Sequence, residues 1–321
     1  MGVRTNIATD ANARASYVQG VLALKAESAG VTTTDLGIPP APGFSAQTVS
    51  TWDLFVIWHV RAMNLQTPAG SGRNAAHRGP AFLPWHRWMM ILLEAQFQRV
   101  LGDPNFGLPY WNWAADGDLA VNQQPNQPVW ANDCMGGSGS PVATGPFAVG
   151  SAFNVRVDTG STGQLAAVDR PLVRSFGSLA PQPFGLPTSA QVASTLTQTQ
   201  YDQSPWNASS GGFRNRVEGW LPSAANSNMH NRVHVWVGGD MGPASSPNDP
   251  VFYLNHCNVD RIWAAWLAAP PAKTYVPAPT QPASLRPHRR NDTVHSILTS
   301  TAPTNAQMLN VSQFYTYDAL P

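Results

Sequence analysis

The 321-residue sequence has little cysteine and no long apolar run. Its two cysteines, Cys134 and Cys257, are too few for a disulfide framework or a cysteine-rich zinc site, and we expect free thiols, although counting alone leaves one bridge open. No run approaches the roughly 20 apolar residues of a membrane helix, and the N-terminus lacks the apolar centre of a secretion signal. We therefore expect no membrane span and a soluble chain, with its compartment left open.

Charge is also scarce. Only 12% of the residues are charged, and 19 Lys and Arg nearly balance 18 Asp and Glu, so we expect no nucleic-acid partner. The sequence is rich instead in hydrophobic residues (43%), with 12 Trp and 29 Pro. This composition predicts a sizeable, aromatic-rich core with much irregular loop.

Two segments with helical spacing of apolar residues lie in the first third of the chain. The first covers about 50–65 and places His59 on its apolar face. The second is predicted to begin at Pro84, a residue suited to the first helical position, and to stop at Gly102. His86 therefore lies in the first turn of the second helix.

Two further helical segments carry histidines near residue 250. The longer one opens with an Asp-Pro pair at 249–250, suited to the N-cap and first position, and holds His256 in its middle. The shorter one, 227–237, ends at a glycine pair and places His230 and His234 four residues apart on one face.

The remaining chain has the composition of loops. Gly, Pro, Ser, Asn and Gln are frequent between 117 and 206, and the tail at 268–321 is similar, whereas 12–27 suits a helix. We find no internal repeat and no alternating βα pattern. We therefore predict a mainly α fold with a central antiparallel helix bundle, long ordered loops and a few short strands.

The His230 and His234 pair has the spacing of a metal site, because residues i and i+4 project their imidazoles from one helix face, about 6 Å apart. Two surface histidines also occur at this spacing by chance. Asn231 stands where the HExxH motif of zinc proteases has Glu, which disfavours a hydrolytic zinc site.

Adding the histidines of the neighbouring helices gives two triads: His59, His77 and His86 upstream, and His230, His234 and His256 downstream. Six imidazoles without carboxylate or thiolate favour copper or zinc over Mg²⁺, Ca²⁺ or Mn²⁺. Any one of them alone is better explained as a hydrogen-bonded core or surface residue, but this explanation does not hold for six histidines in Trp- and Phe-rich helices. The other two histidines, His288 and His295, are expected on the solvated surface of the tail.

Several motifs resemble the tyrosinases, a family of type-3 dicopper proteins. HRGPAFLPWHRWMMILLE at 77–94 resembles the first copper motif, and LPYWNWAADGD at 108–118 resembles its continuation. MHNRVHVWVGGDM at 229–241 and SPNDPVFYLNHCNVDRIWAAW at 246–266 are similar to the second copper motif, and GFRNRVEGW at 212–220 resembles bacterial members.

The resemblance spans nearly the whole chain and implies one catalytic domain, 1–321, with the first copper motif at about 50–118 and the second at about 212–267. It implies two copper ions, one on each histidine triad, and O2 as co-substrate in the oxidation of phenols to o-quinones. Copper suits this chemistry because it cycles between two oxidation states and zinc does not.

The resemblance also implies roles in proton transfer for Glu218 and Asn231, which match a glutamate and an asparagine that can hold a water near the phenol. A phenol has a pKa near 10, so a base and a cationic metal are needed to form phenolate at neutral pH. Two structural alternatives stay open: Glu218 forms an ion pair with Arg214 one turn earlier, and Asn231 caps or packs.

Residues around the second motif are expected to surround the site. Phe252 packs against His256 or the substrate ring, with plain core packing an equal account, while Asp260 either orients the His256 imidazole or pairs with Arg87 or Arg261. Ring selectivity is expected to depend on Val235, Met241, Pro243 and Ala244.

Three functions stay open. The first is a tyrosinase that acts on monophenols and diphenols, which Glu218 and Asn231 favour. The second is a catechol or o-aminophenol oxidase without monophenol hydroxylation, and departures from many relatives at Asn255 and Cys257 bear on substrate preference. The third is an O2 carrier or a copper-storage protein, but the sequence shows neither a partner-repeat domain nor a methionine- or cysteine-rich tract that would support it. The resemblance implies small phenols as substrates and a helper protein for copper loading and export as a candidate partner, so that the chain is either cytoplasmic or exported with this partner.

Overall fold

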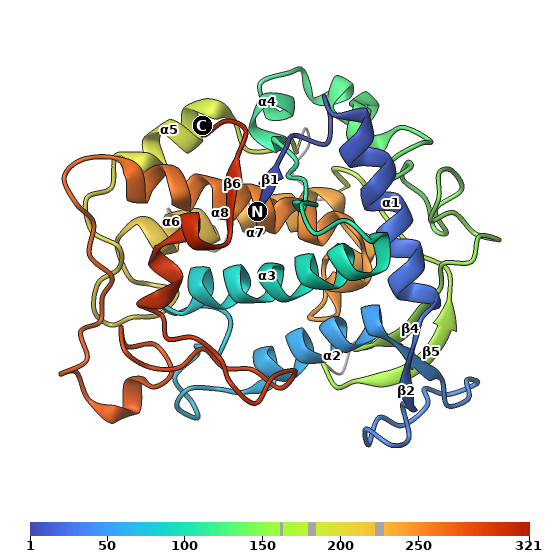
Figure 1. Ribbon diagram of the computed structural model, residues 1–321, viewed down its shortest axis with the longest axis horizontal. Helices are drawn as coiled ribbons and strands as arrows, with labels where there is room; N and C mark the ends of the chain where they lie inside the picture. Colours follow the sequence, from blue (N-terminus) through green and yellow to red (C-terminus); the bar gives the residue numbers. More distant parts are fainter. Residues whose placement is uncertain (161–162, 179–183, 222–227) are drawn as a thin grey trace.

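The computed structural model describes residues 1–160, 163–178, 184–221 and 228–321, and it is mainly helical, as predicted (Figure 1). The α-helices are α1 (Ala11–Ala26), α2 (Thr51–Asn64), α3 (Phe82–Leu101), α4 (Trp113–Gly117), α5 (Ser189–Leu196), α6 (Phe213–Glu218), α7 (Met229–Val237) and α8 (Val251–Ala268). Short 3-10 turns lie at Val121–Asn126, Pro128–Trp130, Gly239–Met241, Ser246–Asn248, Ala283–Leu285, Gln307–Leu309 and Val311–Gln313.

The strands are short and form three two-stranded sheets within the described residues. They are β1 (Gly2–Arg4), β2 (Ser28–Thr32), β3 (Thr48–Ser50), β4 (Val155–Asp158), β5 (Ala166–Arg170) and β6 (Tyr315–Tyr317). The pairs β2–β3 and β4–β5 are antiparallel, whereas β1 and β6 pair in parallel and bring the two ends of the chain side by side. No helix among the described residues is long and apolar enough to cross a membrane.

The helix ends follow from local chemistry. At the start of α2, Ser50 and Asp53 form a capping box, and α3 ends at Gly102, whose φ of 67° suits glycine. The predicted start of α3 at Pro84 is two residues late, because the first helical positions need no N–H donor and the helix begins at Phe82.

Helix α3 lies at the centre of the bundle (Figure 1). It packs on α1 and α8, and it runs antiparallel to α2 and to α8. Eight tryptophans fill the interior with almost no exposure: Trp52, Trp58, Trp85, Trp111, Trp113, Trp236, Trp263 and Trp266. Both cysteines are buried and free, as expected. The aromatic core fixes the helices that carry the histidines.

Candidate metal centre

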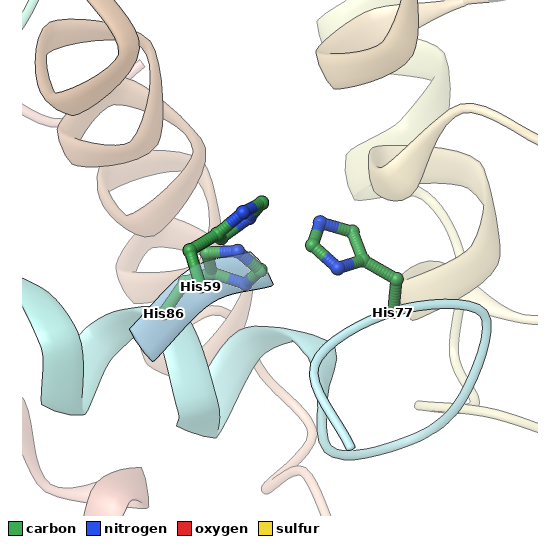
Figure 2. A group of neighbouring side chains, drawn as sticks. All are labelled: His59, His77 and His86. Carbon is green, nitrogen blue, oxygen red and sulfur yellow. The ribbon is translucent and has the colours of Figure 1, made fainter. Parts of the chain in front are cut away.

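The first histidine triad is assembled from two helices and the loop between them. His59 comes from α2, His86 from the first turns of α3 and His77 from the connecting loop, and Figure 2 shows His77 facing the other two imidazoles. The ring centroids are 5.1 Å apart for His59 and His77, and 4.8 Å for His77 and His86. The Asn74 side chain holds the loop by accepting hydrogen bonds from the backbone N–H groups of Ala76 and His77, at 3.0 and 2.7 Å.

The second triad joins α7 and α8. His230 and His234 lie one turn apart on α7, with ring centroids 4.4 Å apart, and His256 from α8 lies 4.6 Å from His230. The Nε2 atoms of His230 and His256 face each other at 3.1 Å. In each triad the candidate ligand nitrogens lie within 4.8 Å of one another, a spacing that suits a shared metal ion.

The two triads are neighbours, because α3 and α8 pack closely where each carries a histidine. The His86 and His256 rings stack with centroids 4.1 Å apart, and the His77 and His230 rings lie 6.1 Å apart. Two ions held by these triads would therefore lie side by side.

Backbone carbonyls fix the orientation of four imidazoles. Each accepts a hydrogen bond from Nδ1: Ala244 from His59 at 2.7 Å, Phe82 from His86 at 2.8 Å, Met241 from His234 at 2.7 Å and Glu218 from His230 at 3.2 Å. Because a carbonyl can only accept, Nδ1 carries the proton and Nε2 presents a lone pair to the centre of its triad.

The donor set fits copper. The Nε2 atoms of His59, His86 and His234 are buried and have no hydrogen-bond partner among the described residues, which is costly for a polar atom unless it binds something. Burial lowers the pKa of all six histidines, to about 3 for His59 and about 4 for His234, so the imidazoles are neutral at pH 7. Neutral imidazole nitrogens without carboxylates suit copper or zinc.

The lowered pKa values predict acid sensitivity of the metal-free protein. An unfolded imidazole has a pKa of about 6.5, so between pH 6.5 and the folded pKa the unfolded chain binds more protons. The contribution of these neutral imidazoles to folding stability is therefore fully present above pH 6.5, and it is lost as the pH falls below that value. In urea unfolding of metal-free protein, a His59→Gln variant should lose about 2 kcal/mol less stability in total between pH 7 and pH 5 than the parent chain. Equal slopes would contradict the buried neutral state of His59.

A pocket of about 260 Å³ opens onto both triads. His59 and His77 of the first triad and His230 and His234 of the second line it, together with Met63, Arg78, Trp220, Asn231, Val235, Gly242, Pro243 and Ser246. The pocket is large enough for a single aromatic ring and joins the two candidate metal sites in one space. Of the residues expected to set selectivity, Val235 and Pro243 line this pocket, whereas Ala244 and Met241 act on His59 and His234 through their carbonyl groups.

Phe252 lies beneath the histidines and is fully buried. Its ring centroid is 4.2 Å from that of His256 and 5.1 Å from that of His59, so it contacts both triads. It is not among the residues that line the pocket. Phe252 therefore packs against the imidazoles, which was one of the three interpretations of the sequence.

Glu218 and Asn231 both lie next to His230. The Asn231 Oδ1 atom is 3.0 Å from His230 Nδ1, and Asn231 lines the pocket. Glu218 is buried, and its carboxylate accepts hydrogen bonds from the backbone N–H of Arg78 at 2.6 Å and from Arg214 at 2.8 Å. The ion pair with Arg214 that the sequence left open is thus present. Burial raises the pKa of the Glu218 carboxyl, against the opposing effect of Arg214.

Asp260 does not orient His256. Its carboxylate accepts hydrogen bonds from Arg87 at 2.5 Å and from the hydroxyl groups of Tyr315 and Tyr317 at 2.6 and 2.5 Å. The Nδ1 atom of His256 has no hydrogen-bond partner among the described residues. The pairing with Arg87 was the correct alternative, and Asp260 ties the end of the chain to α3 and α8 instead.

The prediction that His288 lies on the solvated surface is wrong. His288 is fully buried: its Nδ1 accepts a hydrogen bond from the Ala81 N–H at 3.2 Å, and its Nε2–H donates to Thr67 Oγ1 at 2.7 Å. The ring also packs so close to Gly79 that a Cβ there would meet it at 2.8 Å. His288 therefore supports the loop that carries His77, whereas His295 is partly exposed.

Arg78, Trp220 and Met63 also line the pocket, although they were not predicted from the sequence. Arg78 follows His77 directly, so its place beside the ligands was a usable signal. No sequence signal pointed to Trp220 or Met63, since their contact with the pocket depends on how α2 and the chain after α6 pack together.

Fold and site together define a mainly helical protein with two adjacent three-imidazole candidate metal sites under a shared pocket. The family model for the common central domain of tyrosinase matches residues 49–269. The chain belongs to the tyrosinase family of copper proteins, and its two triads are suited to copper binding.

Sequence similarity to named proteins supports this family. The tyrosinase of Streptomyces glaucescens is 41% identical over 238 residues, which cover 72% of this chain and 77% of the relative. The grixazone synthase of Streptomyces griseus is 37% identical over 298 residues, 83% of this chain and 90% of the relative. A solved structure of a polyphenol oxidase from Thermothelomyces thermophila superposes with a TM-score of 0.69 at 21% identity, over 99% of this chain and 89% of that one, and so shares the fold.

Proposed function

We propose that this chain is a dicopper phenol oxidase that converts o-diphenols to o-quinones and hydroxylates monophenols, with O2 as the oxidant. The observation that carries the proposal is the pocket that opens onto both histidine triads. The proposed ligands are His59, His77 and His86 for one copper, and His230, His234 and His256 for the other. Two copper ions would supply the redox chemistry, taking electrons from the phenol and passing them to O2.

The reaction balances with O2 alone. Two o-diphenols and one O2 give two o-quinones and two waters, and one monophenol and one O2 give one o-quinone and one water. Met63, Val235 and Pro243 present apolar surface to the ring inside the pocket. Backbone carbonyl groups hold four of the six imidazoles and keep the Nε2 lone pairs of these four directed to the centre of each triad, where copper would bind.

Glu218 and Asn231 are proposed to remove the hydroxyl proton of a monophenol. Asn231 lines the pocket, and the Glu218 carboxylate, with its pKa raised by burial, is a stronger base than an exposed glutamate. A carboxylate offers about four lone-pair sites, so the contacts with Arg78 and Arg214 leave room for a water.

The second candidate is a catechol or o-aminophenol oxidase without monophenol hydroxylation. One observation favours it: both Glu218 oxygens already accept hydrogen bonds within the protein, which weakens a carboxylate as a base. The two functions share ligands and metals and differ only in the handling of this proton.

Metal analysis and a matched pair of substrates test the proposal. Protein loaded with copper should hold about two ions per chain, one for each triad. It should consume O2 with both 4-methylphenol and 4-methylcatechol. Oxidation of the catechol alone would select the second candidate, and a chain that takes up zinc but no copper would contradict both. Loading with copper salt alone also tests the proposed helper protein, since full occupancy without it would show that it is dispensable.

A further inference from the structure

The pocket over the histidines has one permanently charged residue in its lining, Arg78. The other lining residues are imidazoles, apolar groups, Trp220, Asn231, Gly242 and Ser246, and no carboxylate lines the pocket among the described residues. A ligand in this pocket therefore meets a net positive charge.

The backbone holds Arg78 in an unusual conformation. Its φ is 59°, in the left-handed region that is unfavourable for a residue other than glycine, and its N–H donates to Glu218 Oε1 at 2.6 Å. Glycine would occupy this position without strain, and Gly79 follows directly. A strained position that nevertheless carries a long cationic side chain indicates that the side chain has a use at the pocket.

Trp220 holds the guanidinium at the edge of the pocket. The Arg78 guanidinium carbon lies 4.8 Å from the centroid of the Trp220 ring, within the range of a cation–π contact, and both residues line the pocket. Among the described residues no acceptor or carboxylate is found for this guanidinium, and Arg78 is exposed. Stacking on a ring face leaves the N–H groups at the edge of the guanidinium free to bind a carboxylate in a bidentate manner.

We infer that Arg78 is a specificity-determining residue that binds the anionic side chain of the substrate, so that the preferred substrates are phenols bearing a carboxylate on the side chain. This inference rests on the proposed phenol oxidase function. The ring enters beside the imidazoles of His230 and His234, and the carboxylate remains at the pocket edge against Arg78. Phenols with a cationic amine meet repulsion at the same place.

Three catechols that differ in side-chain charge provide the kinetic test: 3-(3,4-dihydroxyphenyl)propionate, 4-methylcatechol and dopamine. The copper-loaded protein should show the highest kcat/KM for the acid and the lowest for the amine. Arg78→Gln should lower kcat/KM for the acid by about 5- to 30-fold, mainly through KM, with a smaller loss for 4-methylcatechol and none for dopamine. Arg78→Glu should reverse the order of acid and amine.

Arg290→Gln is the matched control, because Arg290 is exposed, does not line the pocket and carries the same charge. It should keep the parent preference. Higher ionic strength should lower the ratio of kcat/KM for the acid to kcat/KM for the amine in the parent chain, since an exposed charge pair is screened by salt. If Arg78→Gln lowered kcat/KM equally for the acid and the amine, the inference would be overturned and Arg78 would have a structural role.

Binding without turnover gives a second readout. Calorimetric titration of copper-loaded protein in the absence of O2, with 3-(4-hydroxyphenyl)propionate and with tyramine, should show tighter binding of the acid in the parent chain and no preference for it in Arg78→Gln. Equal affinities in the parent chain would overturn the inference. Failure of the phenol oxidase proposal is distinguishable, because the uncharged 4-methylcatechol would then not be oxidised by the parent chain at all.

Discussion

Replacement of His86 or His256 with Ala should lower the copper content from about two ions per chain to about one and should abolish phenol oxidation. The reason is geometric. Each residue supplies one of three imidazoles in its triad, and the two rings stack at 4.1 Å where the triads meet. Loss of either leaves two protein ligands on one copper and disturbs the spacing to the other. Metal analysis by mass spectrometry and O2 uptake with 4-methylcatechol measure both effects.

His295→Ala is the control for this experiment. The His295 side chain belongs to neither triad and is partly exposed. The backbone carbonyl of His295 accepts a hydrogen bond from Trp85 Nε1 at 2.9 Å, and this bond survives the substitution. Copper content and activity should match those of the parent chain. His288 would be a poor control, because its buried ring supports the loop that carries His77. Retention of two coppers by His86→Ala would refute the ligand assignment.

Much of the architecture was predictable because it depends on local patterns. The helical spacing around His59 and the capping signals near residues 50 and 102 lie within a few residues of one another, and the structure places α2 and α3 close to the predicted bounds. The mainly helical fold and the family were confirmed as well. The grouping of the six histidines followed from the motifs, and the structure brings them together in two triads.

The partners that orient the histidines could not be predicted in the same way. Ala244 and Met241 act through backbone carbonyl groups, whose directions depend on the turns after α7 and not on the side chains. The position of His288 was wrongly predicted for a related reason. The tail that contains it is rich in Pro and Arg, which is the composition of a surface segment. This tail nevertheless folds back, and Thr67 and Ala81 form hydrogen bonds with the His288 ring. In both cases long-range packing determines the contact.

The proton-transfer role of Glu218 leads to the second large expected effect. Glu218→Gln should lower monophenol hydroxylation by about 10- to 1000-fold, the scale of a general-base contribution with partial rescue by other groups. Diphenol oxidation should fall less, because a catechol has a second acidic oxygen and depends less on a separate base. Copper content should stay unchanged, since Glu218 is not a proposed ligand. Initial rates with 4-methylphenol and 4-methylcatechol measure the difference.

The difficulty of this experiment is that Glu218 also neutralises Arg214, which is fully buried between Glu218 and Asp202, at 2.8 and 2.7 Å. Asp202→Asn is therefore the matched variant: it removes the other carboxylate from the same guanidinium but does not touch the residues beside His230. Both variants should lower the stability to urea, because each leaves a buried charge less compensated.

Comparison of the two variants separates proton transfer from structure. If Glu218 acts on the phenolic proton, only Glu218→Gln changes the ratio of monophenol to diphenol rates, and Asp202→Asn keeps the ratio of the parent chain despite its lower stability. An identical change of this ratio in both variants would assign the effect to Arg214, and equal losses on both substrates in Glu218→Gln would leave Glu218 a structural role only. The role of Glu218 would then be limited to its ion pair with Arg214, and a catechol oxidase without monophenol hydroxylation would be the better-supported function of the chain.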